Sequence, residues 1–163
     1  MISKSVRPTD DIDSIIRQYS TMLFKICLVI LCNEQDAEDA VQDTFLKYFR
    51  KAPLFDSAEH EKAWLITVAS NICKNMRRFK TMHKQLNIDE LYDYYETHED
   101  AAILEALMLL PDKYKTVLLL YHVEDYKVNE IAQILTISPS AVKMRLQKGR
   151  KLLKEKYREE NAE

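Results

Sequence analysis

The chain contains one glycine, Gly149, among its 163 residues, and only four prolines. Hairpins and barrel corners need residues that tolerate positive φ, so a sequence this poor in glycine disfavours a β fold. Helices joined by short loops need few such residues. The composition, 47% apolar and 31% charged, is that of a globular protein with real cores. We therefore predict an all-α fold.

Helical periodicity of apolar residues marks a first group of helices. The first run extends from Ile12 to Leu31. A second lies within residues 33–51 and is followed by Pro53, which ends the helical pattern. A third forms an apolar ridge from Trp64 to Met76. In the second of these segments the predicted inward face comprises Ala37, Ala40, Val41, Thr44, Phe45, Tyr48 and Phe49. We predict that the group forms a first domain, residues 1–80.

Two local patterns refine this first domain. Asp56 is followed three residues later by Glu59, which is the spacing of a capping box and predicts the start of the third helix there. Trp64 shares the apolar ridge with Leu65 and Val68, so we predict that it packs in the core rather than stacking on bases.

The net charge is only −2, but the charged residues are distributed unevenly along the chain. From Thr81 to Leu110 there are seven acidic residues and one basic residue, Lys84, whereas Lys143 to Arg158 holds eight basic residues against Glu155. Residues 81–100 also lack an apolar period, which predicts an acidic linker. We assign no function to the tyrosines of this segment, Tyr92, Tyr94 and Tyr95.

Beyond the linker we predict a second helical domain, residues 101–163. Its helices are expected at 101–110, stopped by Pro111, at 113–122, at 130–135, and from Ser138-Pro139 onward, where a hydroxyl cap precedes a proline at the first helical position. The fold class is thus two small helical domains joined by an acidic linker.

The segment NEIAQILTISPSAVKMRLQKGRKLL, Asn129 to Leu153, has the layout of a helix-turn-helix. Val142, Leu146, Gly149 and Leu153 fall on one face of its second helix and can pack against Ile131 and Leu135. The other face carries donors suited to base edges and phosphates. The candidate DNA-binding residues are Ser140, Lys143, Met144, Gln147, Lys148 and Lys151. The alternative is a solvated basic face that closes a helical bundle.

The remaining composition argues against several classes of function. Cys27, Cys32 and Cys73 have no C-x-x-C spacing, and the four histidines are scattered, so we expect no metal site and reduced thiols. No phosphate-cradling glycine loop or paired nucleophile and base is visible, so we expect neither a cofactor nor enzymatic activity. No run approaches the roughly 18 to 20 consecutive apolar residues of a membrane span, so we expect no membrane insertion and a cytoplasmic location.

Three motifs in this order resemble a sigma factor of the extracytoplasmic-function group, which keeps regions two and four of the sigma-70 family. DAEDAVQDTFLKYF, Asp36 to Phe49, resembles the polymerase-binding part of region two. AWLITVASNICKNMRR, Ala63 to Arg78, resembles the part that opens and recognises the minus-ten promoter element. LPDKYKTVLLLYHVEDYKVNEIAQIL followed by SAVKMRLQKGRKLL resembles region four, which recognises the minus-thirty-five element.

The resemblance implies promoter-specific transcription initiation, with core RNA polymerase, promoter DNA and an anti-sigma factor as partners. It assigns polymerase binding to an acidic edge formed by Asp36, Asp39, Gln42 and Asp43, which suits a basic partner helix. It assigns contacts with the downstream element to Asn71, Lys74, Asn75, Arg77 and Arg78. The family commonly has arginine where this chain has Ser70, and an acidic residue where it has Asn75.

Two other functions stay open at this stage. A helix-turn-helix repressor or activator acting without polymerase would use the same C-terminal segment, usually as a dimer on a symmetric site. A sigma-like interaction protein would sequester polymerase or an anti-sigma factor without starting transcription.

Overall fold

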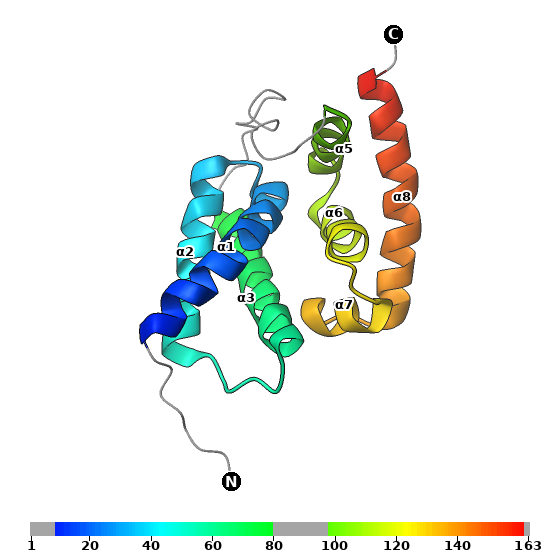
Figure 1. The fold of residues 1–163 in the computed structure, drawn as a ribbon. Coiled ribbons are helices and arrows are strands. Elements are labelled where there is room, and N and C mark those ends of the chain that lie inside the picture. Colours follow the sequence, from blue (N-terminus) through cyan, green and yellow to red (C-terminus); the bar gives the residue numbers. More distant parts are fainter. Residues whose placement is uncertain (1–8, 80–97, 162–163) are drawn as a thin grey trace.

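The structure is a computed structural model that describes residues 9–79 and 98–161, without the side chains of 9–11, 78–79, 98–101 and 160–161. Its described residues form helices and no strand, which confirms the all-α class. In the first domain α1 spans Thr9–Leu31, α2 Glu34–Lys51 and α3 Ala58–Phe79. In the second, α5 spans His98–Met108, α6 Asp112–Leu118, α7 Val128–Leu135 and α8 Pro139–Asn161 (Figure 1). The predicted acidic linker falls mainly on residues 80–97, outside the described residues.

The first domain is built around α1, which packs against both α2 and α3. Leu23, Ile26 and Cys27 of α1 are fully buried, as the periodicity predicted. By length and composition alone, the stretch Ile12–Leu31 would be long and apolar enough to cross a membrane. Its apolar side chains from Ile26 to Leu31 are instead enclosed by neighbouring helices, so packing within the protein accounts for its hydropathy.

The ends of α2 and α3 follow from short polar side chains. Asn33 caps α2, because its side-chain oxygen accepts a hydrogen bond from the backbone N–H of Asp36 at 2.9 Å. At α3 the capping-box prediction for Asp56 and Glu59 is wrong. The helix starts at Ala58, and the Ser57 hydroxyl oxygen accepts from the His60 N–H at 3.1 Å.

The inward face of α2 is narrower than predicted. Ala37, Ala40, Thr44, Phe45 and Tyr48 are buried, but Phe49 is 38% exposed. An aromatic cluster adjoins this buried face. The ring centroids of Tyr48 and Phe55 lie 6.0 and 5.8 Å from that of Trp64. Trp64 is therefore part of this partly buried aromatic cluster and packs against the core.

In the second domain the predicted helices are present with shifted ends. The predicted helix at 113–122 is α6 followed by a π-helical turn, Leu119–Val123. The start of α7 is two residues earlier than the predicted 130, at Val128, where the backbone N–H of Lys127 donates to the Glu130 carboxylate at 3.1 Å. As predicted, Pro139 begins α8, and the Ser138 hydroxyl oxygen accepts from the Ala141 N–H at 3.1 Å.

Between α7 and α8 the chain reverses through Thr136, which has left-handed backbone angles, φ 56° and ψ 49°. The following N–H, from Ile137, donates to the carbonyl of Ala132 at 3.0 Å and closes the end of α7. Ile131 then packs in the same buried cluster as Val142 and Leu146 of α8. The pair forms a helix-turn-helix without the glycine that such turns often carry.

Replacing Thr136 with glycine is expected to raise the free energy of unfolding by about 1 kcal/mol, because a side chain with a Cβ is disfavoured in left-handed backbone. Thr136 is exposed, so little packing is lost. Urea unfolding followed by circular dichroism measures the change. Thr67→Gly within α3, where the backbone is helical, should lower stability instead; a loss of stability in Thr136→Gly would contradict the assignment of strain.

Candidate nucleic-acid and partner-binding surfaces

One long face of α8 is polar, basic and open to solvent. All six candidate residues on it are exposed: Ser140, Lys143, Met144, Gln147, Lys148 and Lys151. The opposite face is buried through Val142 and Leu146. Gly149 lies there against α6, where an added Cβ would sit 3.1 Å from a methyl carbon of Leu118. Close packing on one side therefore holds the basic face outward.

Two ammonium groups near α8 share one aromatic ring of α6. The Nζ atoms of Lys113 and Lys148 lie 5.0 and 5.7 Å from the ring centroid of Tyr114. Desolvation raises the pKa of the Tyr114 phenol, but the hydrogen bonds and charges of the two lysines outweigh it, so that pKa lies below its usual value. The contact holds the ammonium end of the Lys148 side chain beside the Tyr114 ring, although the residue is exposed.

The acidic edge of α2 is also on the surface. Asp39, Gln42 and Asp43 are exposed, whereas Asp36 is partly buried next to its cap, Asn33. Asp36 lies in the first turn of the helix, where a carboxylate interacts favourably with the helix dipole. The three exposed side chains are thus better placed than Asp36 to meet a partner.

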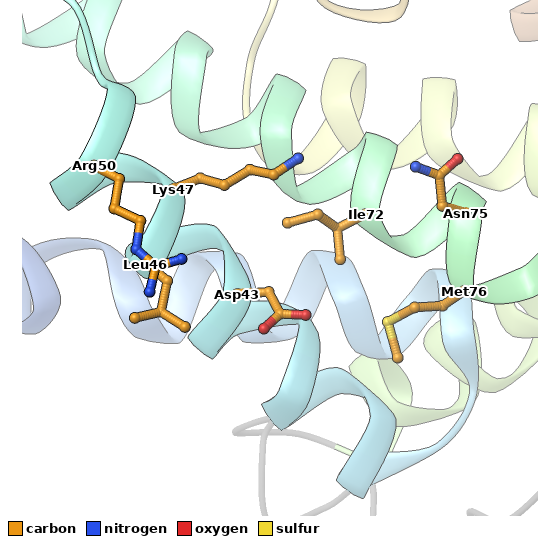
Figure 2. Close-up of a pocket in the computed structure, with 7 residues that line it drawn as sticks. All are labelled: Asp43, Leu46, Lys47, Arg50, Ile72, Asn75 and Met76. Atoms are coloured by element: carbon orange, nitrogen blue, oxygen red, sulfur yellow. The ribbon is translucent and has the colours of Figure 1, made fainter.

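A groove of about 480 Å³ separates α2 from α3 and adds residues that the sequence did not single out. Figure 2 shows Asp43 and Lys47 on its α2 wall and Asn75 on its α3 wall. Leu46, whose side chain is 47% exposed, also lines the groove, as does Arg50. An apolar side chain three residues after Asp43, on a helix face that is otherwise charged, is the sequence signal that could have identified this groove.

The candidate residues of α3 are distributed over two surfaces. Asn71 and Lys74 line a cavity that the two domains share, whereas Asn75 lines the groove beside α2. Arg77 is half-buried and its Nη2 donates to the Asp112 carboxylate at 3.0 Å. The Arg78 side chain lies outside the described residues. Two of these residues therefore face the second domain, and a third is bound to it.

The two domains meet through polar contacts that close around Lys115, a residue of α6 with 0% exposure. Its Nζ donates to the carbonyl of Ile30 at 3.0 Å, near the end of α1, and lies 3.3 Å from the Asp112 carboxylate. The same ammonium lies 3.5 Å from the sulfur of Cys32. At the far end of the interface, Lys62 pairs with Glu124 at 3.2 Å.

The comparison with known protein families assigns both halves of the chain to one class. Residues 15–81 match sigma-70 region 2, and residues 100–153 match sigma-70, region 4. Both regions occur in the order that sigma factors have, and together they span most of the chain. The chain belongs to the sigma-70 family, in its extracytoplasmic-function group, and sigma factors are transcription initiation factors.

Curated relatives agree with this assignment over nearly the whole length. The sigma factor SigW of Bacillus subtilis is 27% identical, with 98% of each chain covered. SigV of the same organism is 28% identical over 85% of this chain and 86% of its own.

Solved structures show the same fold. RpoE of Bartonella quintana, solved with the anti-sigma factor NepR, has a TM-score of 0.74 at 20% identity, covering 91% of this chain and 97% of that one. CnrH, solved with the cytosolic domain of CnrY, has a TM-score of 0.67 at 21% identity, covering 91% and 88%.

Replacing Lys115 with alanine is expected to loosen the contact between the domains by about 2 kcal/mol, because hydrogen bonds to a buried charged group are lost. Cys32, buried against the carbonyl of Met108 at 3.6 Å, then becomes accessible to an alkylating reagent. Mass spectrometry of alkylated peptides measures the rate. Cys27 and Cys73, buried together in the first domain, serve as internal controls. Equal labelling of all three thiols would indicate general unfolding instead.

Proposed function

We propose that this sigma factor binds core RNA polymerase and directs it to promoters through two separate surfaces. The acidic edge of α2, with Asp39, Gln42 and Asp43 exposed, docks on a basic polymerase surface. The exposed face of α8 enters the major groove upstream, at the minus-thirty-five element. The observation that carries the proposal is the helix-turn-helix geometry of α7 and α8, with a buried apolar face and a fully exposed basic one, in a chain that matches region 4.

The first domain is proposed to capture the melted downstream element with α3. Asn71, Lys74 and Asn75 are exposed, and the amides suit unstacked bases while the lysine suits a phosphate. Arg77 and Arg78 complete the proposed set. The domain boundaries that go with this assignment are 1–80 for region two, 81–100 for the linker and 101–163 for region four.

Three further assignments accompany the proposal. The chain performs no covalent chemistry, because catalysis belongs to the polymerase, and it works in the cytoplasm where the polymerase is. No metal or cofactor is required. RpoE of Bartonella quintana was solved with an anti-sigma factor, so a regulatory protein of that kind is a proposed partner of this chain.

Reversing charge on α2 tests the polymerase surface. Asp39→Lys with Asp43→Lys should weaken holoenzyme assembly at least tenfold, because like charges would then face each other, while DNA binding by the C-terminal domain stays nearly intact. Pull-down with core polymerase measures the loss. Asp13→Lys with Glu38→Lys, two exposed sites with the same change in charge, is the matched control. Unchanged polymerase binding in the Asp39 and Asp43 variant would refute this assignment.

Removing donors from α8 tests the upstream surface. Lys143→Ala, Gln147→Ala and Lys148→Ala together should leave holoenzyme assembly intact but reduce run-off transcription, since each base-edge contact contributes about 1 to 3 kcal/mol. The loss should occur on a promoter with an intact upstream element and vanish when that element is scrambled. Lys154→Ala with Arg158→Ala, exposed and nearer the end of α8, removes equal charge as a control. Equal loss on both promoters would count against recognition by this face.

A further inference from the structure

The cavity between the two domains has a lining of unusual chemistry. It measures about 260 Å³ and takes Ser70, Asn71 and Lys74 from α3 on one side. Its polar residues from the second domain are Asp112, Lys113, Thr116 and Arg145. Three of these seven polar side chains are cations, and they come from three different helices, α3, α6 and α8.

The one carboxylate in the lining, that of Asp112, is already engaged. The Asp112 carboxylate accepts from Arg77 at 3.0 Å and lies 3.3 Å from the Lys115 ammonium. No second carboxylate lines the cavity among the described residues, so three cations leave its wall with an excess of positive charge. A cavity with such a wall is complementary to an anion rich in acceptor oxygens.

A second observation points the same way. Ser70 is only 8% exposed and lines the cavity, and its hydroxyl has no hydrogen-bond partner among the residues that the structure describes. A buried hydroxyl without a partner is unfavourable, and in native proteins such a group usually has a reason such as a bound molecule. An anion in the cavity would accept this hydrogen bond.

We propose that the cavity binds a small phosphate-bearing anion held by both domains. Lys74 and Arg145 approach it from opposite domains, and Ser70 donates to a phosphate oxygen. The volume is below the roughly 300 to 1,000 Å³ of pockets for drug-sized ligands, so the ligand is inorganic phosphate, pyrophosphate or a small phosphorylated metabolite. Ile30, Leu135 and Ile137 form an apolar wall for the organic part of such a metabolite.

The ligand also has a consequence for regulation, which rests on the proposed function. Because its partners come from both domains, it binds only while the domains are together and stabilises that arrangement by mass action. Asn71 and Lys74 are then withheld from downstream DNA. The anion and the melted promoter strand therefore compete for the same side chains.

Titration calorimetry of the full-length chain with inorganic phosphate and pyrophosphate, at constant ionic strength without magnesium, tests the site. Saturable binding near one equivalent is expected. Arg145→Gln should weaken it about tenfold or more, because a charged hydrogen-bonding partner is lost. Lys154→Gln, an exposed site on the same helix with the same change in charge, should leave it unchanged. No saturable binding, or equal weakening in both variants, would overturn the proposal.

Ser70→Ala provides an independent readout. It should weaken pyrophosphate binding about tenfold, by removal of a hydrogen bond to a charged group, while the melting temperature without ligand stays the same or rises. A variant that merely disturbed packing would lower the melting temperature. Lower melting temperature with unchanged affinity would overturn the role of Ser70 and with it the site.

Run-off transcription in parallel separates this inference from the proposed function. Specific transcription without anion binding refutes the cavity as a site and leaves the function intact. Anion binding without any specific transcription refutes the proposed function and leaves the site. If both hold, pyrophosphate should displace a single-stranded downstream fragment from the native chain but not from Arg145→Gln; failure to displace it would overturn the competition.

Discussion

The burial of the Lys115 ammonium constrains the arrangement of the whole molecule. Burying an ammonium group costs free energy unless its N–H groups find acceptors and its charge is neutralised. Here the Ile30 carbonyl accepts a hydrogen bond and the Asp112 carboxylate neutralises the charge. The carbonyl belongs to the last turn of α1, where the helix dipole also favours a cation. Cys32, with φ 54°, ends the helix at this point. The first domain thus supplies a fixed acceptor, and sliding the second domain would deprive the buried ammonium of its hydrogen bond to Ile30.

Asp112 extends this constraint to the nucleic-acid surface. The carboxylate that neutralises Lys115 also accepts from Arg77, so one side chain joins the buried contact to a residue of α3. Asn75 stays beside α2, in a groove open to a partner, while Asn71 and Lys74 turn toward the second domain. Breaking one ionic cluster would therefore change the access to several candidate DNA contacts together.

Local patterns in the sequence predicted the helices and much of the surface, and missed what depends on distant contacts. The basic face of α8 and the turn at Thr136 follow from residues within one segment, so periodicity was sufficient. A charged residue in a helix normally indicates a solvent-exposed position, so no local pattern indicated that Lys115 is buried. Its burial depends on acceptors that are distant in the sequence, such as the carbonyl of Ile30, which is 85 residues away along the chain. The Ser57 cap was missed because Asp56 and Ser57 are both good caps, and only the backbone geometry distinguishes them. The exposure of Phe49 similarly depends on where α3 packs.

The positions of the charged surfaces suggest an order of events for the proposed function. Figure 1 places α2 and α8 on opposite sides of the molecule, with the interface of the two domains between them. The acidic edge and the basic face can thus engage a basic protein surface and a DNA groove at the same time, and the net charge of −2 conceals this separation. Neither contact requires the domains to part. Under the proposed function, contact between a melted strand and Asn71 or Lys74 is restricted while the domains are together, because these exposed side chains line a cavity with the second domain. Separation at Lys115 would then be the step that opens both side chains to the strand.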